Sequence, residues 1–430
     1  MFWDKEWETL SRAELEQWQL RRLRSTVQHV ARHVPFYQQK CAERGLGARA
    51  ILSLKDIRRL PFTTREDLRA TYPFGLLAVD RADVIRLHTS SGTTGKPKAM
   101  FFSKKDVAGA ADLIARCLVM TGVGRGDVLQ NMMTYGLFTG ALVMHYGAEK
   151  VGLMVIPAGP GNSERQCLLM QDFRTTVFHT TPSYALYLAQ FLKERGIDPR
   201  RDLSLRKAYI GAEPYSDETR RKIESALGVK VYNSYGLSEM NGPGVAFECE
   251  HQQGMHLWED HFLIEIVDPA TGNPVPDGEE GEMVLTTLRR EAMPILRYRT
   301  RDITSVIRTP CPCGRTHRRI RRITGRADDM LIVRGVNLYP QQIERVLMSL
   351  PAVGHSYQIH LEGLDELIVK VELADASFDG RVEHLVNLQR EIVERLRADL
   401  LVKPRVELLP PGSLPVSEGK AKRVFDKRIL

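Results

Sequence analysis

The chain has 430 residues, of which 43% are hydrophobic, 27% charged and 7% aromatic. This composition excludes a mainly disordered chain, a collagen-like repeat and a small disulfide-stapled scaffold. The length predicts about two or three domains. Lys and Arg exceed Asp and Glu by 61 to 53, a net charge of +8. So modest an excess suits either nucleic acid or phosphorylated small ligands.

The cysteines are too sparse for an oxidised framework; they are Cys41, Cys117, Cys167, Cys249, Cys311 and Cys313. The first residues, MFWDKEWETL, have no apolar core, so we expect no signal peptide. No uninterrupted apolar stretch reaches roughly 18 residues, which predicts no transmembrane helix and no membrane partner. We therefore expect a cytoplasmic protein with reduced thiols.

Residues 5–45 predict helix, because apolar positions recur there every three or four residues among charges. The middle of the chain alternates short apolar runs, such as residues 151–159 and 175–183, with longer amphipathic stretches. That alternation is typical of βαβ units. It predicts an α/β fold with a mainly parallel sheet flanked by helices.

Residues 255–324 predict a smaller β subdomain with short strands and frequent turns. The turn signals are Thr271-Gly272-Asn273 and Pro276-Asp277-Gly278. The basic run at residues 317–322 contains no aromatic residue that could stack on a base. We therefore expect a strand with a solvated arginine face there, and no nucleic-acid partner.

The last hundred residues predict a compact α+β unit in the order β-α-β-β-α-β. Its expected strands are residues 330–335, 356–363, 366–373 and 405–410, and its helices begin near Pro340 and cover residues 381–400. We expect a domain boundary near residues 325 to 330. It separates a large domain, residues 1–325, from a small one, residues 326–430.

Residues 90–98, SSGTTGKPK, concentrate hydroxyls, glycines and a lysine directly after an apolar stretch. Small residues let backbone N–H groups approach an anion, while hydroxyls and the ammonium of Lys96 add hydrogen bonds and charge. The segment differs from a Walker A loop in its glycine spacing and in the proline after the lysine. It predicts a phosphate-binding loop.

Further polar segments carry chemistry. Glu239, in YNSYGLSE, follows an apolar run at the expected end of a strand, where a carboxylate could hold Mg²⁺ bound to phosphates. Asp302, in YRTRD, offers a carboxylate to the hydroxyls of a ribose. GRADD, residues 325–329, suits a hinge. The lysine-rich run at residues 415–423 would, alone, be read as a solvated tail.

In their order and content, these segments resemble the adenylate-forming enzymes, which include acyl-CoA synthetases, luciferase and peptide-synthetase adenylation domains. The resemblance spans essentially the whole chain and is greatest to the phenylacetate–CoA ligase branch. The matching segments are SSGTTGKP, YGLFTG, HYGAE, TTPSYAL, YGLSEM, WEDHF, RYRTRD, GRADDMLIVRGVN and SEGKAKRV. It implies a large N-terminal α/β domain with a β subdomain and a small, mobile C-terminal α+β domain.

The resemblance also implies an ATP-dependent acid–CoA ligase. In such enzymes a carboxylate attacks the α-phosphate of ATP, giving an acyl adenylate and pyrophosphate, and the thiol of CoA then displaces AMP. ATP, Mg²⁺ and CoA are the implied cofactors, and a small carboxylic acid is the implied partner. The net charge is then better explained by ATP and CoA than by nucleic acid.

Residue by residue, the resemblance assigns the following roles. The β- and γ-phosphates would be bound by Ser91, Thr93, Thr94, Gly95 and Lys96. Adenine would be lined by Gly211, Ala212, Glu213, Ser234 and Tyr235, and Ser238 and Arg326 would complete the nucleotide site. Asp302 would hold the ribose and Glu239 the Mg²⁺. Asp328 would be the hinge residue, and the loop around Gly335 would line the CoA tunnel.

Lys420 would bridge the attacking carboxylate and the α-phosphate during adenylation. Lys422 is a rival for this role, but only Lys420 follows a glycine and precedes Arg423 by three residues, as the family pattern asks.

The acid pocket implied by the resemblance would be built from Tyr135, Gly136, Phe138, Thr139, Thr181 and Pro182. Aromatic rings grouped with glycines form a flat apolar slot, suited to an aromatic acid such as phenylacetate or a benzoate-type acid. A small branched or hydroxylated acid stays open. So does a coenzyme F390 synthetase-like adenylyltransferase that uses no CoA. A non-catalytic nucleotide-binding protein would be expected to lack Lys420, Glu239 or the phosphate loop, and all are present.

A separate hypothesis concerns Cys311-Pro312-Cys313-Gly314, a turn that presents two thiols. Together with Cys249 and a histidine, they could form a four-ligand structural zinc site. His256 is the preferred histidine and His251 the alternative. The competing interpretation is a set of reduced, unliganded thiols. The amphipathic N-terminal helix could also serve as a homodimer contact.

Overall fold

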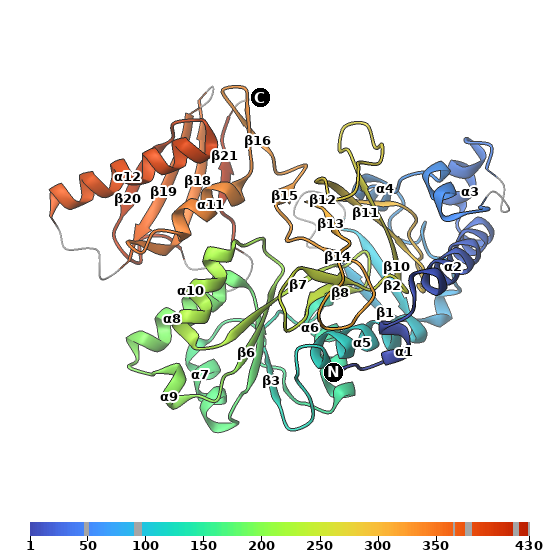
Figure 1. Cartoon of the computed structure of the whole chain (residues 1–430), viewed down its shortest axis with the longest axis horizontal. Helices are drawn as coiled ribbons and strands as arrows, with labels where there is room; N and C mark the ends of the chain where they lie inside the picture. The colour runs from blue at the N-terminus through green and yellow to red at the C-terminus, as the bar shows by residue number, and fades with distance from the viewer. Residues whose placement is uncertain (47–50, 90–96, 364–365, 375–380, 416–420, 429–430) are drawn as a thin grey trace. The chain divides into compact units, whose positions relative to one another are not determined.

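The computed structural model describes residues 1–46, 51–89, 97–363, 366–374, 381–415 and 421–428. The chain divides into two compact units. Unit 1 joins Met1–Gly159 to Tyr232–Arg322, and unit 2 joins Pro160–Val231 to Ile323–Leu430. Figure 1 traces the elements of both. The domain boundary near residue 325 stays a prediction.

Unit 1 begins with three helices where the periodicity predicts one. They are α1 (Lys5–Glu8), α2 (Arg12–His33) and α3 (Pro35–Ala42). The first break lies at Ser11, whose hydroxyl accepts the N–H of Glu14 while the Glu14 carboxylate accepts the N–H of Ser11. This capping box starts a new helix. Pro35 causes the second break, because proline favours the first turn of a helix. Leu15, Leu23, Val27 and Val30 of α2 are buried within the chain, whereas Trp18 and Leu20 are half-buried.

The remainder of the first stretch of unit 1 contains one βαβ unit. Strands β3 (Val128–Asn131) and β4 (Met154–Ile156) pair in parallel, and α6 (Thr139–Val151) connects them. This confirms the predicted alternation. Before it come η1 (Leu54–Arg59), α4 (Arg65–Ala70), η2 (Arg81–Asp83), the antiparallel pair β1 (Val84–Thr89) and β2 (Ala99–Ser103), and α5 (Lys104–Val119).

The second stretch of unit 1 is antiparallel. Its strands are β7 (Lys230–Leu237), β8 (Gly242–Glu248), β9 (Met255–Leu257), β10 (Phe262–Val267), β11 (Gly281–Thr287), β12 (Tyr298–Thr304), β13 (Val306–Ile307) and β14 (Arg319–Ile320). Neighbouring pairs run β7-β8-β9-β14-β13 and β10-β11-β12. Gly272 and Gly278, at the predicted turns, have φ of +72° and +87°.

The prediction of a solvated arginine face over residues 317–322 is wrong at Arg319, which is buried. Its guanidinium donates to the carbonyl oxygens of Gln253 and Thr309, at 2.5 and 2.7 Å. A buried guanidinium needs such acceptors, and a hydropathy pattern does not reveal them.

The first stretch of unit 2 contains a second βαβ unit. Strands β5 (Val177–Thr180) and β6 (Lys207–Gly211) pair in parallel, and α8 (Pro182–Glu194) lies between them in sequence. The other helices of this stretch are α7 (Ser163–Asp172), α9 (Pro199–Asp202) and α10 (Asp217–Leu227).

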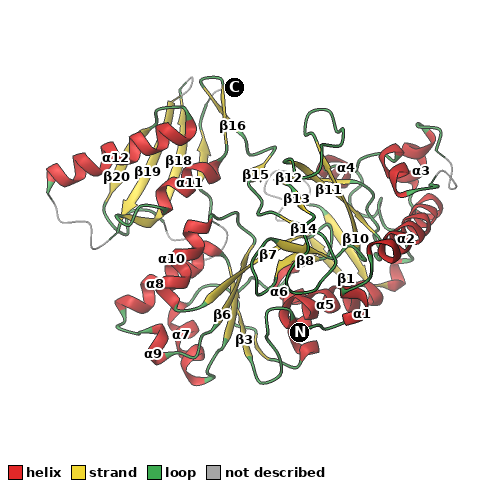
Figure 2. Ribbon diagram, viewed as in Figure 1, coloured by secondary structure: helices red, strands yellow, loops and turns green. Residues whose placement is uncertain are grey.

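The second stretch of unit 2 contains the predicted order of strands and helices, with additions. Its elements are β15 (Gly325–Arg326), β16 (Leu331–Val333), β17 (Val336–Leu338), α11 (Pro340–Met348), β18 (Val353–Glu362), β19 (Glu366–Leu373), α12 (Val382–Leu400), β20 (Arg405–Leu409) and β21 (Val424–Asp426). Strand β16 lies within the strand predicted at residues 330–335, whereas β15, β17 and β21 were not expected from the sequence. Strands β20-β19-β18-β21 form one sheet, beside which α11 and α12 lie (Figures 1 and 2).

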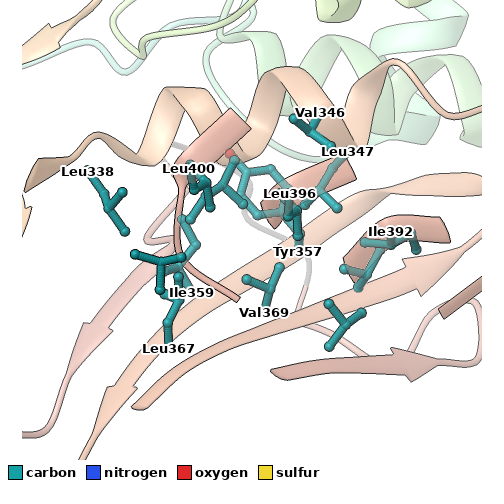
Figure 3. Close-up of a cluster of buried hydrophobic side chains, with 14 of the residues drawn as sticks. Leu338, Val346, Leu347, Tyr357, Ile359, Leu367, Val369, Ile392, Leu396 and Leu400 are labelled. Carbon is teal, nitrogen blue, oxygen red and sulfur yellow. The ribbon is translucent and has the colours of Figure 1, made fainter. Parts of the chain in front are cut away.

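An apolar core joins these two helices to the sheet. Leu347 from α11 and Leu396 from α12 pack with Ile359 of β18 and Val369 of β19 (Figure 3). The members of this core alternate along both strands, as side chains that share one face of a sheet must. None of the helices in the described ranges has the length and apolar character needed to cross a membrane.

Leu396→Ala is expected to destabilise this sheet and its helices by about 2–5 kcal/mol, because the fully buried side chain leaves a cavity. Hydrogen exchange of the β18 and β19 amides measures the loss. Val386→Ala, on the same helix but 45% exposed, is the matched control and should leave their protection unchanged. Equal protection in both variants would contradict the packing described.

Candidate active site

The side chain of Glu239 lies buried in unit 1, just beyond β7. Its Oε1 accepts a hydrogen bond from the hydroxyl of Tyr298 at 2.8 Å and another from the ammonium of Lys98, with which it forms an ion pair. Burial disfavours the charged form, but the charge and hydrogen bond of Lys98 and the hydroxyl of Tyr298 outweigh it. The pKa of Glu239 therefore lies below its ordinary value.

Asp302, a second buried carboxylate of unit 1, lies on β12. Its Oδ2 accepts a hydrogen bond from the hydroxyl of Tyr235 at 2.6 Å. The β11–β12 register shifts beside it, and Arg301 has a φ of +67°. Such a bulge re-aims the side chains that follow. Tyrosines from two segments thus each bind a carboxylate contributed by the other, Tyr235 to Asp302 and Tyr298 to Glu239.

The segment expected to line the acid pocket precedes and opens α6. Thr139, in its first turn, is buried and donates through Oγ1 to Oγ of Ser238 at 2.8 Å. Tyr135 accepts a hydrogen bond from the amide of Asn131 at 2.9 Å and lies 3.1 Å from Nδ1 of His145. Phe138 is 44% exposed. Its ring is therefore available to a ligand, unlike that of an ordinary core residue.

Gly136 has a φ of +109°, in the left-handed region. Ser234 lies buried on β7, beside Tyr235. In unit 1 the structure thus connects the predicted acid segment to the predicted nucleotide segment through the hydrogen bond between Thr139 and Ser238.

In unit 2, strand β6 ends at Gly211, and Ala212 follows with a φ of +67°. Residues other than glycine rarely adopt this left-handed conformation. Where they do, they occur often at functional sites. Next to it, the carboxylate of Glu213 accepts hydrogen bonds from the hydroxyl of Ser183 at 3.0 Å and its N–H at 3.3 Å. Burial raises the pKa of Glu213.

Thr181 and Pro182, both expected in the acid pocket, open helix α8. Thr181 is the N-cap, and its hydroxyl accepts the N–H of Tyr184 at 3.3 Å. Pro182 occupies the first helical turn. Both are buried, with Thr181 close to the Ser183 hydroxyl at 3.2 Å.

The predicted hinge segment carries a paired arginine. Arg326 binds Asp328 through two hydrogen bonds, of 2.9 and 3.0 Å, in a bidentate arrangement. Gly335, expected near CoA, has a φ of +75° in the turn between β16 and β17, where Arg334 is also left-handed. Such a turn favours glycine.

Some predicted residues lie outside the described residues, and the structure places none of them. They are Ser91, Thr93, Thr94, Gly95 and Lys96 of the phosphate loop, together with Lys420.

A cysteine–histidine cluster lies in unit 1. The ligand atoms of Cys249, His256, Cys311 and Cys313 are all within 4.8 Å of one another. The sulfurs of Cys249 and Cys311 are 3.6 Å apart, and the sulfur of Cys313 is 3.3 Å from Nε2 of His256. The cluster contains His256, the preferred histidine, and does not contain His251, the alternative.

The electrostatics of the cluster favour a thiolate at Cys313. A hydrogen bond from Cys249 and the proximity of His256 hold the pKa of the Cys313 thiol far below its ordinary value, despite burial. A thiolate is the form that binds a metal.

Two family models match most of the chain, and known proteins match it over its full length. The AMP-binding enzyme model matches residues 20–288, and the AMP-binding enzyme C-terminal domain model matches residues 335–428. The phenylacetate–coenzyme A ligase of Thermus thermophilus is 47% identical, over the full length of both chains. That of Escherichia coli is 42% identical, over 98% of this chain and 97% of its own.

The chain belongs to the AMP-binding enzymes, on their phenylacetate–CoA ligase branch. It is an AMP-forming acyl-CoA ligase, which joins a carboxylic acid to CoA through an acyl adenylate made with ATP. The crystal structure of 2-hydroxyisobutyryl-CoA ligase, in the postadenylation state with 2-HIB-AMP, matches with a TM-score of 0.94 and 31% identity, over 99% of this chain and 92% of the other.

The same ligase with 2-HIB-AMP and CoA, in the thioesterification state, matches with a TM-score of 0.73 and 31% identity, again over 99% of this chain and 92% of the other. These similarities confirm the adenylate-forming fold and the use of ATP and CoA expected from the sequence.

Sequence reasoning about this acyl-CoA ligase missed three residues that hold the site carboxylates. Lys98 ends the glycine-rich string, Tyr298 begins YRTRD, and Ser183 lies within TTPSYAL. The sequence signal that could have identified them is that each lies inside one of the recognised motifs. Their partners were not visible, because Lys98 and Glu239 are 141 residues apart in the sequence.

Lys98→Met is expected to destabilise the ligase by about 3–5 kcal/mol, because it leaves the buried carboxylate of Glu239 without its cation. The double variant Lys98→Met/Glu239→Gln should recover most of this loss. Denaturant titration of the single and double variants measures the coupling.

The matched control is Lys105→Met, which removes an ammonium that is 81% exposed in its pair with Glu291. Its unfolding midpoint should match the wild type. If the Lys98 variant matched it too, the ion pair would contribute nothing to stability.

Proposed function

We propose that the protein makes the CoA thioester of phenylacetate or a closely related aryl acid. The observation that carries the proposal is the full-length identity of 42–47% to several proteins named phenylacetate–coenzyme A ligase. The segment around Tyr135, Gly136 and Phe138 supports it, since a half-exposed ring beside a glycine leaves room for a flat apolar group.

Within this proposal, the residues divide the first chemical step between them. Asp302, whose Oδ2 accepts a hydrogen bond from the hydroxyl of Tyr235, would accept a further hydrogen bond from a ribose hydroxyl. Lys420 neutralises charge as the acid attacks the α-phosphate, and the phosphate loop holds the outer phosphates of ATP. Catalysis of this kind depends mainly on orientation and electrostatic stabilisation.

Glu239 fits the role of a Mg²⁺ ligand. Mg²⁺ bound to nucleotide phosphates takes one or two protein carboxylates, and Glu239 is buried with its charged form favoured. The ion would supply positive charge to the phosphate oxygens. Because the ammonium of Lys98 binds the same carboxylate, Lys98 would have to share or yield that oxygen. Activity that depends on added Mg²⁺ would support this role.

A small hydroxy acid is the second candidate substrate. The similarity to 2-hydroxyisobutyryl-CoA ligase supports it, but at 30–31% identity against 42–47% for the phenylacetate ligases. We therefore favour the aromatic acid.

A panel of acids tests the substrate. Phenylacetate, benzoate, anthranilate, hydroxybenzoates and 2-hydroxyisobutyrate are each assayed for pyrophosphate release and CoA-dependent AMP release. We expect kcat/KM for phenylacetate to exceed that for 2-hydroxyisobutyrate by about 100-fold or more, because a buried ring contributes a few kcal/mol more than two methyl groups.

A higher kcat/KM for 2-hydroxyisobutyrate than for phenylacetate would contradict the assignment of an aromatic substrate. Adenylation of an acid that CoA never accelerates would instead point to the adenylyltransferase alternative.

We also propose that residues 326–430 act as a mobile lid, turning about Asp328, with the loop around Gly335 facing CoA after adenylation. Its support is the separate core of this stretch and the matched C-terminal family model. A homodimer and a cytoplasmic location complete the proposal. The described cysteines, all of which are free, suit a reducing compartment.

The cysteine–histidine cluster is proposed to hold a structural zinc ion. Tetrahedral zinc with Zn–S bonds of 2.3 Å places its sulfurs about 3.8 Å apart, close to the 3.6 Å between Cys249 and Cys311. Four protein ligands would leave no position for a substrate, so the ion would stabilise the fold of residues 249–314 without taking part in the reaction.

Metal analysis of protein purified without chelators should find about one zinc per chain. Cys311→Ser should lose most of it and lower the thermal midpoint, because metal binding contributes to folding free energy. Cys167→Ser, a buried thiol outside the cluster, is the control and should retain zinc. If the wild-type protein contained no stoichiometric metal, the zinc proposal would be wrong and the cysteines of the cluster would be reduced, unliganded thiols.

A further inference from the structure

Two stretches of unit 2 that lie far apart in the sequence meet at the carboxylate of Glu213. Its Oε1 accepts a hydrogen bond from the backbone N–H of Ala421 at 2.5 Å and one from the hydroxyl of Ser183 at 3.0 Å. Ala421 directly follows Lys420 in the sequence. Glu213 therefore binds the backbone next to the lysine proposed to act in adenylation.

Burial raises the pKa of Glu213, and several groups around its carboxyl group offset part of that effect. Ser183 belongs to the first turn of α8, where free N–H groups and the helix dipole favour a negative charge. Arg423 adds a positive charge close by, and its guanidinium is held 4.1 Å above the ring of Tyr357. A buried carboxylate with several donors has little freedom to move, so the N–H that it binds is held in place.

A second buried carboxylate fastens the same two stretches together. Glu344, on α11, accepts hydrogen bonds from the N–H and hydroxyl of Ser216 at 3.2 and 3.3 Å, and from the hydroxyl of Thr219. These donors lie at the N-terminus of α10. Nearby, the ammonium of Lys222 donates to the carbonyl of Val353 at 3.0 Å. Glu213 and Ala421 thus meet within a larger set of contacts between the two stretches.

We propose that Glu213 is a positioning residue for Lys420, holding the backbone after the lysine so that its ammonium can reach the α-phosphate during adenylation. This inference rests on the proposed role of Lys420. It differs from a role in lining adenine, because the adenine is bound in both steps of the reaction, whereas the lysine would act in the first alone.

The two half-reactions separate these roles. Glu213→Ala should lower kcat of adenylation, measured by acid-dependent pyrophosphate exchange, by about 10- to 100-fold, the effect of losing a hydrogen bond to a charged group. KM for ATP and the rate of thioester formation from supplied acyl adenylate should stay within about twofold of the wild type. Glu213→Gln should restore most of the adenylation rate, because its amide oxygen still accepts the N–H of Ala421.

Glu164→Ala is the matched control, since it removes an exposed carboxylate of the same unit that pairs with Arg195. It should leave both half-reactions unchanged. If Glu213→Ala does not fold, the same two half-reactions are measured for Ser183→Ala, which removes a hydroxyl that orients the same carboxylate. A loss confined to adenylation in that variant supports the inference, and no loss overturns it.

Lys420→Ala distinguishes failure of this inference from failure of the proposed function. If Lys420→Ala retains adenylation, the role proposed for the lysine is wrong and the inference falls with it. If Lys420→Ala abolishes adenylation while Glu213→Ala leaves it intact, only the positioning role is wrong. If Glu213→Ala instead slowed both half-reactions equally and raised KM for ATP, Glu213 would be assigned to the adenine site.

Discussion

A carboxylate taken out of water must be given hydrogen-bond donors or a cation, and the described parts of the site depend on this constraint. Glu239 accepts hydrogen bonds from Lys98 and Tyr298, and Asp302 accepts one from Tyr235. In the other unit, Glu213 and Glu344 are each bound by donors at a helix N-terminus. Each pairing joins segments that are remote in the sequence. The constraint therefore places the motifs beside one another as well as stabilising them.

The elements with regular patterns could be predicted from the sequence. The α11–β18–β19–α12 order was visible in its periodicity, and parallel pairing of β3 with β4 followed from the alternation of strands and helices. The break at Ser11 was missed, because a capping box inside a periodic stretch does not disturb the apolar spacing. Strand β21, only three residues long, has no pattern of its own and exists through its pairing with β18.

The candidate site divides in the same way. Motif residues such as Glu239 and Asp302 were proposed as site residues from the sequence, because each motif is contiguous in the chain. The bonds between motifs were not, since nothing in a single sequence relates Tyr235 to Asp302 or Lys98 to Glu239. Thr181 and Pro182 open helix α8, and the use of the Thr181 hydroxyl as a cap could not be told from their assignment to an apolar pocket.

Unit 2 is assembled from Pro160–Val231 and Ile323–Leu430, with Tyr232–Arg322 belonging to unit 1. During synthesis, the ribosome therefore completes all of Tyr232–Arg322 before α11 emerges. Until then, the hydroxyls of Ser216 and Thr219 have no Glu344 to bind, and the nascent β5–α8–β6 unit must persist without its later partner. The order of translation thus makes unit 2 the last part of the chain to reach its final contacts.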